Sequence, residues 1–233
     1  MDVAWASAVA KKPWAAVLFD MDGTLVDSAA MVTRRFAETF RHFDVQVPSP
    51  AELHSLVGPS AETTMVKYLG PEAKAEGIIF YRELAKRDGV SGLELFSGVR
   101  ELIARLEANS VKMAVATSKP EEEAKNILRH FGILESFEVV SGASDARGIH
   151  HKADVIRGAV DRLSLETGES SIMVGDRFFD IEGAAECGIP SLFVAWGGAD
   201  SIEAEGAIRS FEMPNDLSDF LLGIVDTDSR VSP

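Results

Sequence analysis

Residues 16–28 read AVLFDMDGTLVDS, and this stretch decides the fold. A continuous apolar run, WAAVLF at 14–19, ends at Asp20, and after one Met a second acid follows, Asp22. A short, wholly apolar run bounded by turn-forming residues indicates a strand buried on both faces of a parallel sheet. Ligands of such sheets gather outside the carboxyl ends of the strands. The two carboxylates are therefore expected at a functional site.

Four later apolar runs have the same character, and helical patterns separate them. The runs are 111–116, 137–140, 171–174 and 191–195, and the helical patterns are 98–109, 120–131, 152–163 and 180–187. Alternation of strands and helices predicts an α/β fold, a Rossmann-like parallel sheet covered on both faces.

Residues 28–97 break this alternation because their periodicity is helical throughout. The expected helices are 30–43, 50–57, 61–69 and 71–88. We therefore expect an inserted all-helical domain at 28–97, with the α/β core formed by residues 1–27 and 98–233.

Composition and charge narrow the class of partner. The formal net charge is −14, which opposes binding to a nucleic acid polymer or to an anionic membrane. No apolar run reaches the roughly 18–20 residues of a membrane span. The N-terminal order of charges is wrong for a secretory signal, so residues 1–12 are expected to be a loose leader. A single cysteine, Cys187, excludes an intrachain disulfide, and together these features predict a cytoplasmic protein of undetermined oligomeric state.

Polar and charged residues follow several of the expected strands. Thr117, Ser118 and Lys119 follow the run at 111–116, Asp176 and Asp180 follow the run at 171–174, and Lys152 opens the helix after 137–140. Clustered carboxylates repel one another unless they share a cation, and oxygen ligands beside a phosphate suit Mg²⁺. One Asp of the first pair can attack phosphorus and form an aspartyl-phosphate, while the other can transfer protons.

Lys119 competes with Lys152 for the phosphate-binding role. Pro120 and three glutamates follow Lys119, so we interpret it as a charge partner at a helix start. The adjacent His150 and His151 are expected on the surface or in a loop.

Four motifs resemble those of the haloacid dehalogenase-like phosphatases, in the same order. They are DMDGTLVDS at 20–28, VATSKP at 115–120, HK at 151–152 and GDRFFDI at 175–181. Within that family the pattern is similar to phosphoglycolate phosphatases and to a 5′-nucleotidase-like subgroup.

The resemblance implies a role for each matching residue. Asp20 is expected to be the nucleophile and Asp22 the general acid/base. The substrate phosphate is expected to lie among Gly23, Thr117, Ser118 and Lys152. The expected Mg²⁺ ligands are Asp20, the backbone carbonyl of Asp22, and Asp176, with Asp180 as an auxiliary acid. The helical insert is expected to be a mobile cap.

These roles predict a Mg²⁺-dependent phosphatase that hydrolyses small phosphate monoesters through an aspartyl-phosphate on Asp20. The alternatives are a 5′-nucleotidase, a phosphomutase and a receiver-type signalling module; the D-x-D spacing and the long insert argue against the last. A dehalogenase is disfavoured because displacing halide needs neither Asp22 nor a metal.

Two stretches depart from the family pattern and leave the substrate open. Residues 144–152 do not match the usual loop before the motif lysine. Phe178 and Phe179 stand where relatives place polar residues, and they either pack wholly in the core or divide between the core and a cap or substrate contact. The turn Trp196-Gly197-Gly198 follows the last apolar run and is a further candidate for the site edge.

Overall fold

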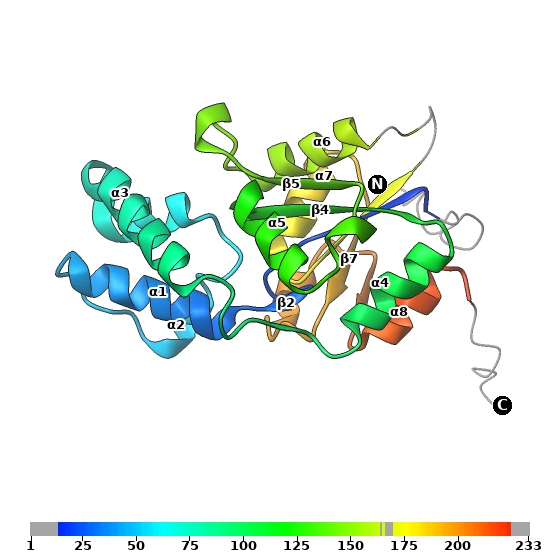
Figure 1. Cartoon of the computed structure of the whole chain (residues 1–233), viewed down its shortest axis with the longest axis horizontal. Helices are drawn as coiled ribbons and strands as arrows, with labels where there is room; N and C mark the ends of the chain where they lie inside the picture. Colours follow the sequence, from blue (N-terminus) through cyan, green and yellow to red (C-terminus); the bar gives the residue numbers. More distant parts are fainter. Residues whose placement is uncertain (1–13, 164, 166–169, 225–233) are drawn as a thin grey trace.

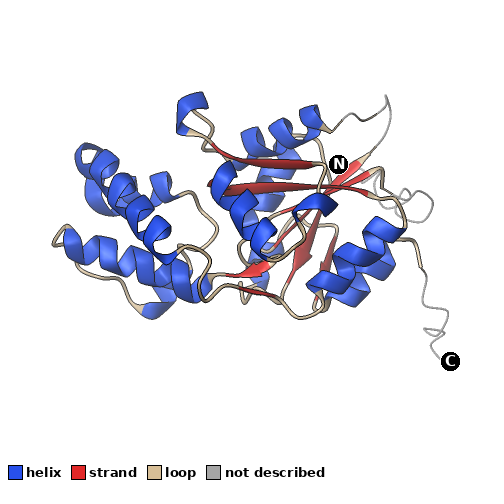
Figure 2. Ribbon diagram, in the orientation of Figure 1, coloured by secondary structure: helices blue, strands red, loops and turns tan. Residues whose placement is uncertain are grey.

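A six-stranded parallel sheet forms the centre of the molecule (Figures 1 and 2). The computed structural model describes residues 14–163, 165 and 170–224, so the expected leader at 1–12 lies outside the described residues. The strand order is β5-β4-β1-β6-β7-β8. The strands are β1 (Ala16–Phe19), β4 (Lys112–Pro120), β5 (Val139–Ala143), β6 (Ser171–Gly175), β7 (Ser191–Val194) and β8 (Arg209–Phe211). The expected α/β class is confirmed.

Helices cover both faces of this sheet, as Figure 1 shows. One face packs against α6 (Lys152–Arg162) and α7 (Phe178–Glu186), and the other against α4 (Val99–Ala108), α5 (Glu121–His130) and α8 (Pro214–Leu221). All four side chains of β1 are fully buried, since alternate residues enter the two apolar layers. The described part of the core also has three short 3₁₀ helices, at Leu134–Ser136, Asp145–Arg147 and Ser201–Ala204.

The order of connections determines where the site lies. From β1 the chain, after its helical insert, builds β4 and β5 on one side and then returns to place β6 on the other side of β1. In open α/β sheets, ligands bind outside the carboxyl ends of the strands at the point where this order reverses, here between β1 and β6.

The insert leaves and rejoins the core through a two-stranded antiparallel ribbon, β2 (Val26–Asp27) and β3 (Glu94–Leu95). Between them lie α1 (Ala29–His42), α2 (Pro50–His54) and α3 (Ala61–Asp88), which form a separate lobe in Figure 1. The lobe has its own apolar cluster, formed by Val32, Phe36, Phe40, Leu56, Val57, Met65, Ile78 and Tyr81.

The break expected between the helices at 61–69 and 71–88 is present: α3 is kinked at Gly70 (φ 81°, ψ 168°), just before Pro71, where the backbone is not helical. The strand expected to end at 116 continues to Pro120 with a register shift between Thr117 and Pro120. No helix in the described part of the chain is long and apolar enough to cross a membrane.

Candidate active site

The ends of β1 and β6 bring two of the predicted acids, Asp20 and Asp176, to the same edge of the sheet. Phe19 pairs with Val174 in the parallel register, and the Asp20 N–H donates to the Val174 carbonyl over 2.9 Å. Asp20 and Asp176 therefore follow neighbouring strands at the switch point. On the other side of β1, Phe19 pairs with Val115, which places Thr117 just beyond the same edge.

Three carboxylates and one ammonium group converge there. Carboxylate oxygens of Asp20, Asp176 and Asp180 lie within 4.8 Å of one another, and all three residues are buried. The Lys152 Nζ is 2.6 Å from an oxygen of Asp20 and 2.6 Å from an oxygen of Asp180. Asp180 is fixed by helix geometry as well, since its other oxygen accepts the Arg177 N–H at the start of α7 over 3.0 Å.

This crowding raises the pKa values of the acids. Burial raises the pKa of Asp20 to about 7; Lys152 opposes the shift, and Asp180 and Asp22 add to it. The pKa of Asp176 is also raised well above its ordinary value, first by burial and then by Asp180 and Asp20. Burial would lower the pKa of Lys152, but Asp180 and Asp20 outweigh it and raise that pKa. One ammonium thus does not neutralise the cluster.

The donor set fits a small divalent cation. Three buried carboxylates facing one lysine leave negative charge that a metal can share, and hard oxygen donors are the ligands that Mg²⁺ prefers. The structure brings Asp180 into the same group as Asp20 and Asp176. Asp180 could thus hold a metal directly, which goes beyond the auxiliary role expected for it.

The other predicted phosphate-binding residues lie in the turn after β1 and near the end of the neighbouring strand β4. Gly23 has φ +88°, and a Cβ there would lie 2.1 Å from an oxygen of Asp176, so only glycine allows this approach. Thr117 is buried, and its hydroxyl accepts the Lys119 N–H over 3.2 Å; Ser118 beside it is half-buried. The Thr24 hydroxyl donates to Asp176 over 2.9 Å and orients that carboxylate.

The turn after β7 closes the site edge. The Trp196 indole N–H donates to the Thr24 carbonyl over 2.9 Å. A Cβ on Gly197 would lie 2.3 Å from the Gly23 carbonyl oxygen and 2.9 Å from an oxygen of Asp176. The turn is therefore packed against the acidic cluster.

The Asp22 carboxylate has different partners from those of the three clustered acids. One of its oxygens accepts the Ser28 hydroxyl over 2.5 Å, and the other is 3.1 Å from the Lys119 Nζ. Interpreting Lys119 only as a helix-start charge partner was incomplete: it does lie 3.7 Å from Glu123, but it is buried against Asp22. No sequence signal indicated this contact, because the apolar run was expected to end at 116, whereas β4 continues to Pro120 and carries Lys119.

The insert contacts the core around the site. The Arg177 guanidinium donates to the Ser55 carbonyl over 3.4 Å, and a Cβ on Gly58 would strike the Arg177 side chain. The His150 Nδ1 lies 2.6 Å from a carboxylate oxygen of Glu62 at the start of α3. His150 and His151 lie in the loop before α6, as expected.

Phe178 and Phe179 are not core residues. They are 42% and 41% exposed, so the interpretation that both pack in the core is wrong. They occupy the first turn of α7, whose next residue, Asp180, is buried in the site.

Known proteins match this chain over most of its length. The family model described as haloacid dehalogenase-like hydrolase matches residues 17–194. The tyrosine-protein kinase PtkA of Mycobacterium tuberculosis is 40% identical over 181 residues, which are 78% of this chain and 62% of the relative. The chain thus spans less than two thirds of that relative's length.

Other relatives carry the names of phosphatases. A 5′-nucleotidase of Pseudomonas aeruginosa is 33% identical over 78% of this chain and 82% of the relative. A phosphoglycolate phosphatase of Rhodospirillum rubrum is 27% identical over 88% and 90% of the two chains. Among solved structures, a predicted phosphatase from Clostridium acetobutylicum superposes with a TM-score of 0.84 and 32% identity, covering 91% of this chain and 99% of that one.

Proposed function

The chain belongs to the haloacid dehalogenase-like hydrolase family, and from this premise we propose that it is a Mg²⁺-dependent phosphatase of small phosphate monoesters. The observation that carries the proposal is the convergence of Asp20, Asp176, Asp180 and Lys152 at one sheet edge. A bound Mg²⁺ would neutralise charge on these carboxylates and on the phosphoryl oxygens.

The proposed reaction has two steps, and the residues of this chain divide the work. An oxygen of Asp20 attacks phosphorus, and the bond to the leaving oxygen breaks as that oxygen takes a proton from the Asp22 carboxyl. A water then attacks the phosphorus of phospho-Asp20 and gives its proton back to Asp22, which releases phosphate and restores Asp20. Thr117, Ser118, Lys152 and the backbone at Gly23 are proposed to hold the phosphoryl oxygens.

The insert at 28–97 is proposed to be a mobile cap. It contacts the core at Arg177, which follows Asp176, and at His150 and Glu123, and its closing would exclude water from the reacting groups. The residues that the cap presents would then select the substrate, which we propose to be a small phosphate ester similar to phosphoglycolate.

The test compares variants on p-nitrophenyl phosphate with Mg²⁺ and with EDTA. We expect turnover that requires Mg²⁺ and disappears in Asp20→Asn, because an amide cannot serve as the nucleophile. Asp161→Asn on the exposed end of α6 is the matched control and should keep the full rate. Full activity of Asp20→Asn would contradict the proposal, and so would metal-independent turnover.

Two relatives favour other substrates. The 5′-nucleotidase name favours nucleoside monophosphates, and the PtkA name favours transfer of a phosphoryl group to a tyrosine hydroxyl. A panel of phosphoglycolate, nucleoside monophosphates, sugar phosphates and pyrophosphate, compared by kcat/KM, separates the phosphatase candidates. Incubation with γ-labelled ATP and a tyrosine-containing polymer tests the kinase candidate, because only phosphoryl transfer would label the polymer.

A further inference from the structure

A row of alternating charges runs from Asp22 into the insert. Lys119 contacts Asp22 at 3.1 Å and Glu123 at 3.7 Å. The same oxygen of Glu123 is 3.2 Å from the Arg35 guanidinium, whose Nε is 3.1 Å from an oxygen of Asp88. The row is therefore Asp22, Lys119, Glu123, Arg35 and Asp88, with every cation between two carboxylates.

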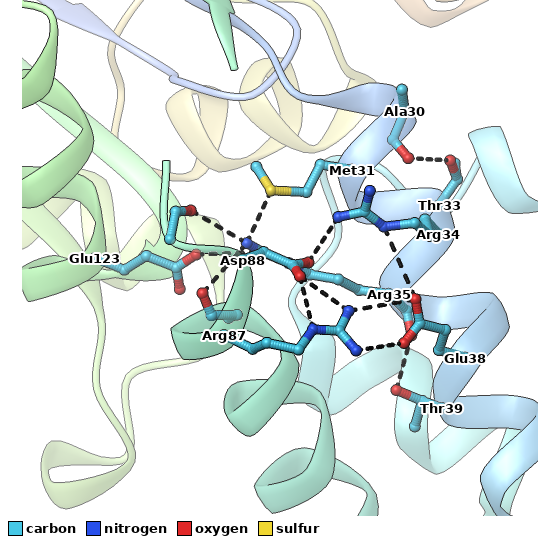
Figure 3. Close-up of polar contacts among 12 residues, drawn as sticks. Ala30, Met31, Thr33, Arg34, Arg35, Glu38, Thr39, Arg87, Asp88 and Glu123 are labelled. Atoms are coloured by element: carbon cyan, nitrogen blue, oxygen red, sulfur yellow. Dashed lines mark hydrogen bonds and ion pairs between the residues drawn. The ribbon is translucent and has the colours of Figure 1, made fainter. Parts of the chain in front are cut away.

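The row crosses from the core to the insert. Lys119 is the last residue but one of β4, and Glu123 lies in the first turn of α5. Arg35 comes from α1, and Asp88 ends α3. Figure 3 shows Arg35 reaching from α1 between Asp88 and Glu123. Its guanidinium also donates to the Met31 sulfur over 2.9 Å, and this contact further restrains its position.

Both cations are buried, and neither would remain so without its partners. Arg35 is 1% exposed and Lys119 is 9% exposed. Taking such a group out of water is unfavourable unless opposite charges surround it. Asp22 at 3.1 Å and Glu123 at 3.7 Å provide these charges for Lys119. The place of Lys119 thus depends on Glu123, and that of Glu123 on Arg35.

We propose that Lys119 is a positioning residue for Asp22, and that Arg35 holds it in place through Glu123. The Ser28 hydroxyl on one oxygen and the Lys119 ammonium on the other fix the plane of the Asp22 carboxyl group. As Asp22 gives its proton to the leaving oxygen it gains negative charge, which the ammonium stabilises. Because Arg35 belongs to the insert, Asp22 is fully positioned only when the insert packs against α5.

This inference rests on the proposed acid role of Asp22, and leaving-group dependence tests both. p-Nitrophenolate leaves without a proton, whereas the alkoxide of an alkyl phosphate needs one. The probes are p-nitrophenyl phosphate and phosphoglycolate, or the alkyl ester with the highest kcat/KM in the panel above. Hydrolysis of phospho-Asp20 is the same step for both substrates, so the comparison uses kcat/KM, which covers only the steps up to departure of the leaving group. Loss of the positioned acid should reduce kcat/KM on the alkyl ester by about 100-fold and on p-nitrophenyl phosphate far less.

The variants are Lys119→Met, Arg35→Met and Glu123→Gln, with Asp22→Asn as the reference. Arg34→Met is the matched control: Arg34 contacts the same oxygen of Asp88 at 2.9 Å but is 54% exposed, and its ion pairs are with Asp88 and Glu38. We expect each of the three variants to lower the alkyl-to-nitrophenyl ratio of kcat/KM by at least about tenfold, and Arg34→Met to leave it within about twofold. In the double variant of Arg35 and Lys119 the two effects should not add, because both residues act through one contact.

Each outcome has a distinct meaning. If Asp22→Asn lowers the ratio while the other variants lower both rates equally, the positioning role is wrong and the proposed function stands. If Asp22→Asn itself leaves the ratio unchanged, the acid role in the proposed function is wrong. A damaged fold cannot imitate the expected result, since it would reduce both substrates alike, and Glu123→Gln, which keeps size and polarity at a 27% exposed side chain, tests the row without emptying a buried position.

Discussion

Among single residues, Gly23 is where the backbone lies closest to the acidic cluster. Gly23→Ala should place a methyl group against the Asp176 carboxylate, since a Cβ there lies 2.1 Å from one oxygen. The substitution also requires an L residue at φ +88°, which costs about 1–2 kcal/mol. We expect kcat to fall by about 100-fold, because the displaced carboxylate spoils the geometry of the site.

Gly92→Ala separates the two causes. Gly92 has a similar φ of +81° but no atom within 4 Å of its added Cβ. The Gly92→Ala variant should therefore lose only the stability that an L residue at positive φ costs, about 1–2 kcal/mol, and its kcat should be unchanged. Equal kcat values for the two variants, measured beside melting temperatures, would show that the approach of Gly23 to Asp176 is unimportant.

Asp176 allows the metal to be tested without measuring activity. Its raised pKa reflects burial and repulsion from Asp180 and Asp20, so Asp176→Asn should melt at or above the wild type in EDTA. In Mg²⁺ at about 100 times its Kd, the wild type should gain about 2.7 kcal/mol and the variant should gain much less. The readout is the melting temperature with and without Mg²⁺; Asp216→Asn on α8 should keep the full gain. An undiminished gain in Asp176→Asn would remove this residue from the metal site.

The predictability of the site also differs from residue to residue. Asp20, Asp22, Thr117 and Asp176 could be found because each follows an apolar run that reads as a strand, and the topology rules bring such ends together. Arg35 could not, because it is one of many charged residues on α1 and only tertiary packing against α3 and α5 buries it. The assigned chemistry of all these residues remains a prediction until it is measured.

At the scale of elements, the ionised carboxylate of Asp88 at the end of α3 makes a pH-dependent contribution to stability. Burial by itself would raise the pKa of Asp88, but hydrogen bonds from Arg34, Arg87 and Arg35 lower it to about 2. A carboxyl with a lower pKa in the folded state stabilises the fold above its ordinary value of 3.8, and this contribution disappears as the pH falls toward 2.

Asp88→Asn should therefore be less stable than the wild type near neutral pH, and the difference should shrink as the pH falls from about 4 to 2. Urea midpoints of both proteins across this range provide the measurement. Asp216→Asn is again the control, since no ion pair of that residue is among those found in the described chain. A difference that stays constant with pH would mean that Asp88 acts through packing and not through its charge.

Helices and strands could be predicted from the sequence where an apolar run or a helical periodicity extends over enough residues to be recognised. The break at Gly70-Pro71 was expected, because glycine and proline together interrupt a helix. The strand β8 was missed because it has three residues, two of them exposed, and is recognisable only by its pairing with β7. The ribbon of β2 and β3 was missed for the same reason: its partners are two residues long and far apart in the chain.

At the scale of the whole molecule, the core and the insert have separate interiors. The cluster within the insert includes no residue of the six-stranded sheet, and the two clusters on that sheet take from the insert chiefly Met31 and Leu93. Covalent connection runs only through β2 and β3, where Asp27 pairs with Glu94. We infer that the sheet can fold without the insert, whereas selection of the substrate requires the insert.

Joining Asp27 to Glu94 by a two-residue Asn-Gly turn tests this, since that turn suits an antiparallel pair. The shortened chain should unfold cooperatively at a lower temperature, because Met31 and Leu93 no longer fill the core and each such loss costs about 2–5 kcal/mol. It should keep a Mg²⁺-dependent rise in melting temperature, because Asp20, Asp176 and Asp180 all come from the core. Its kcat/KM values for phosphoglycolate and for a nucleoside monophosphate should converge, as nothing then surrounds the leaving group. If the shortened chain keeps the selectivity of the full chain, the substrate is selected by the core. The exposed side chains of Phe178 and Phe179 would then be the first candidates for substrate contacts.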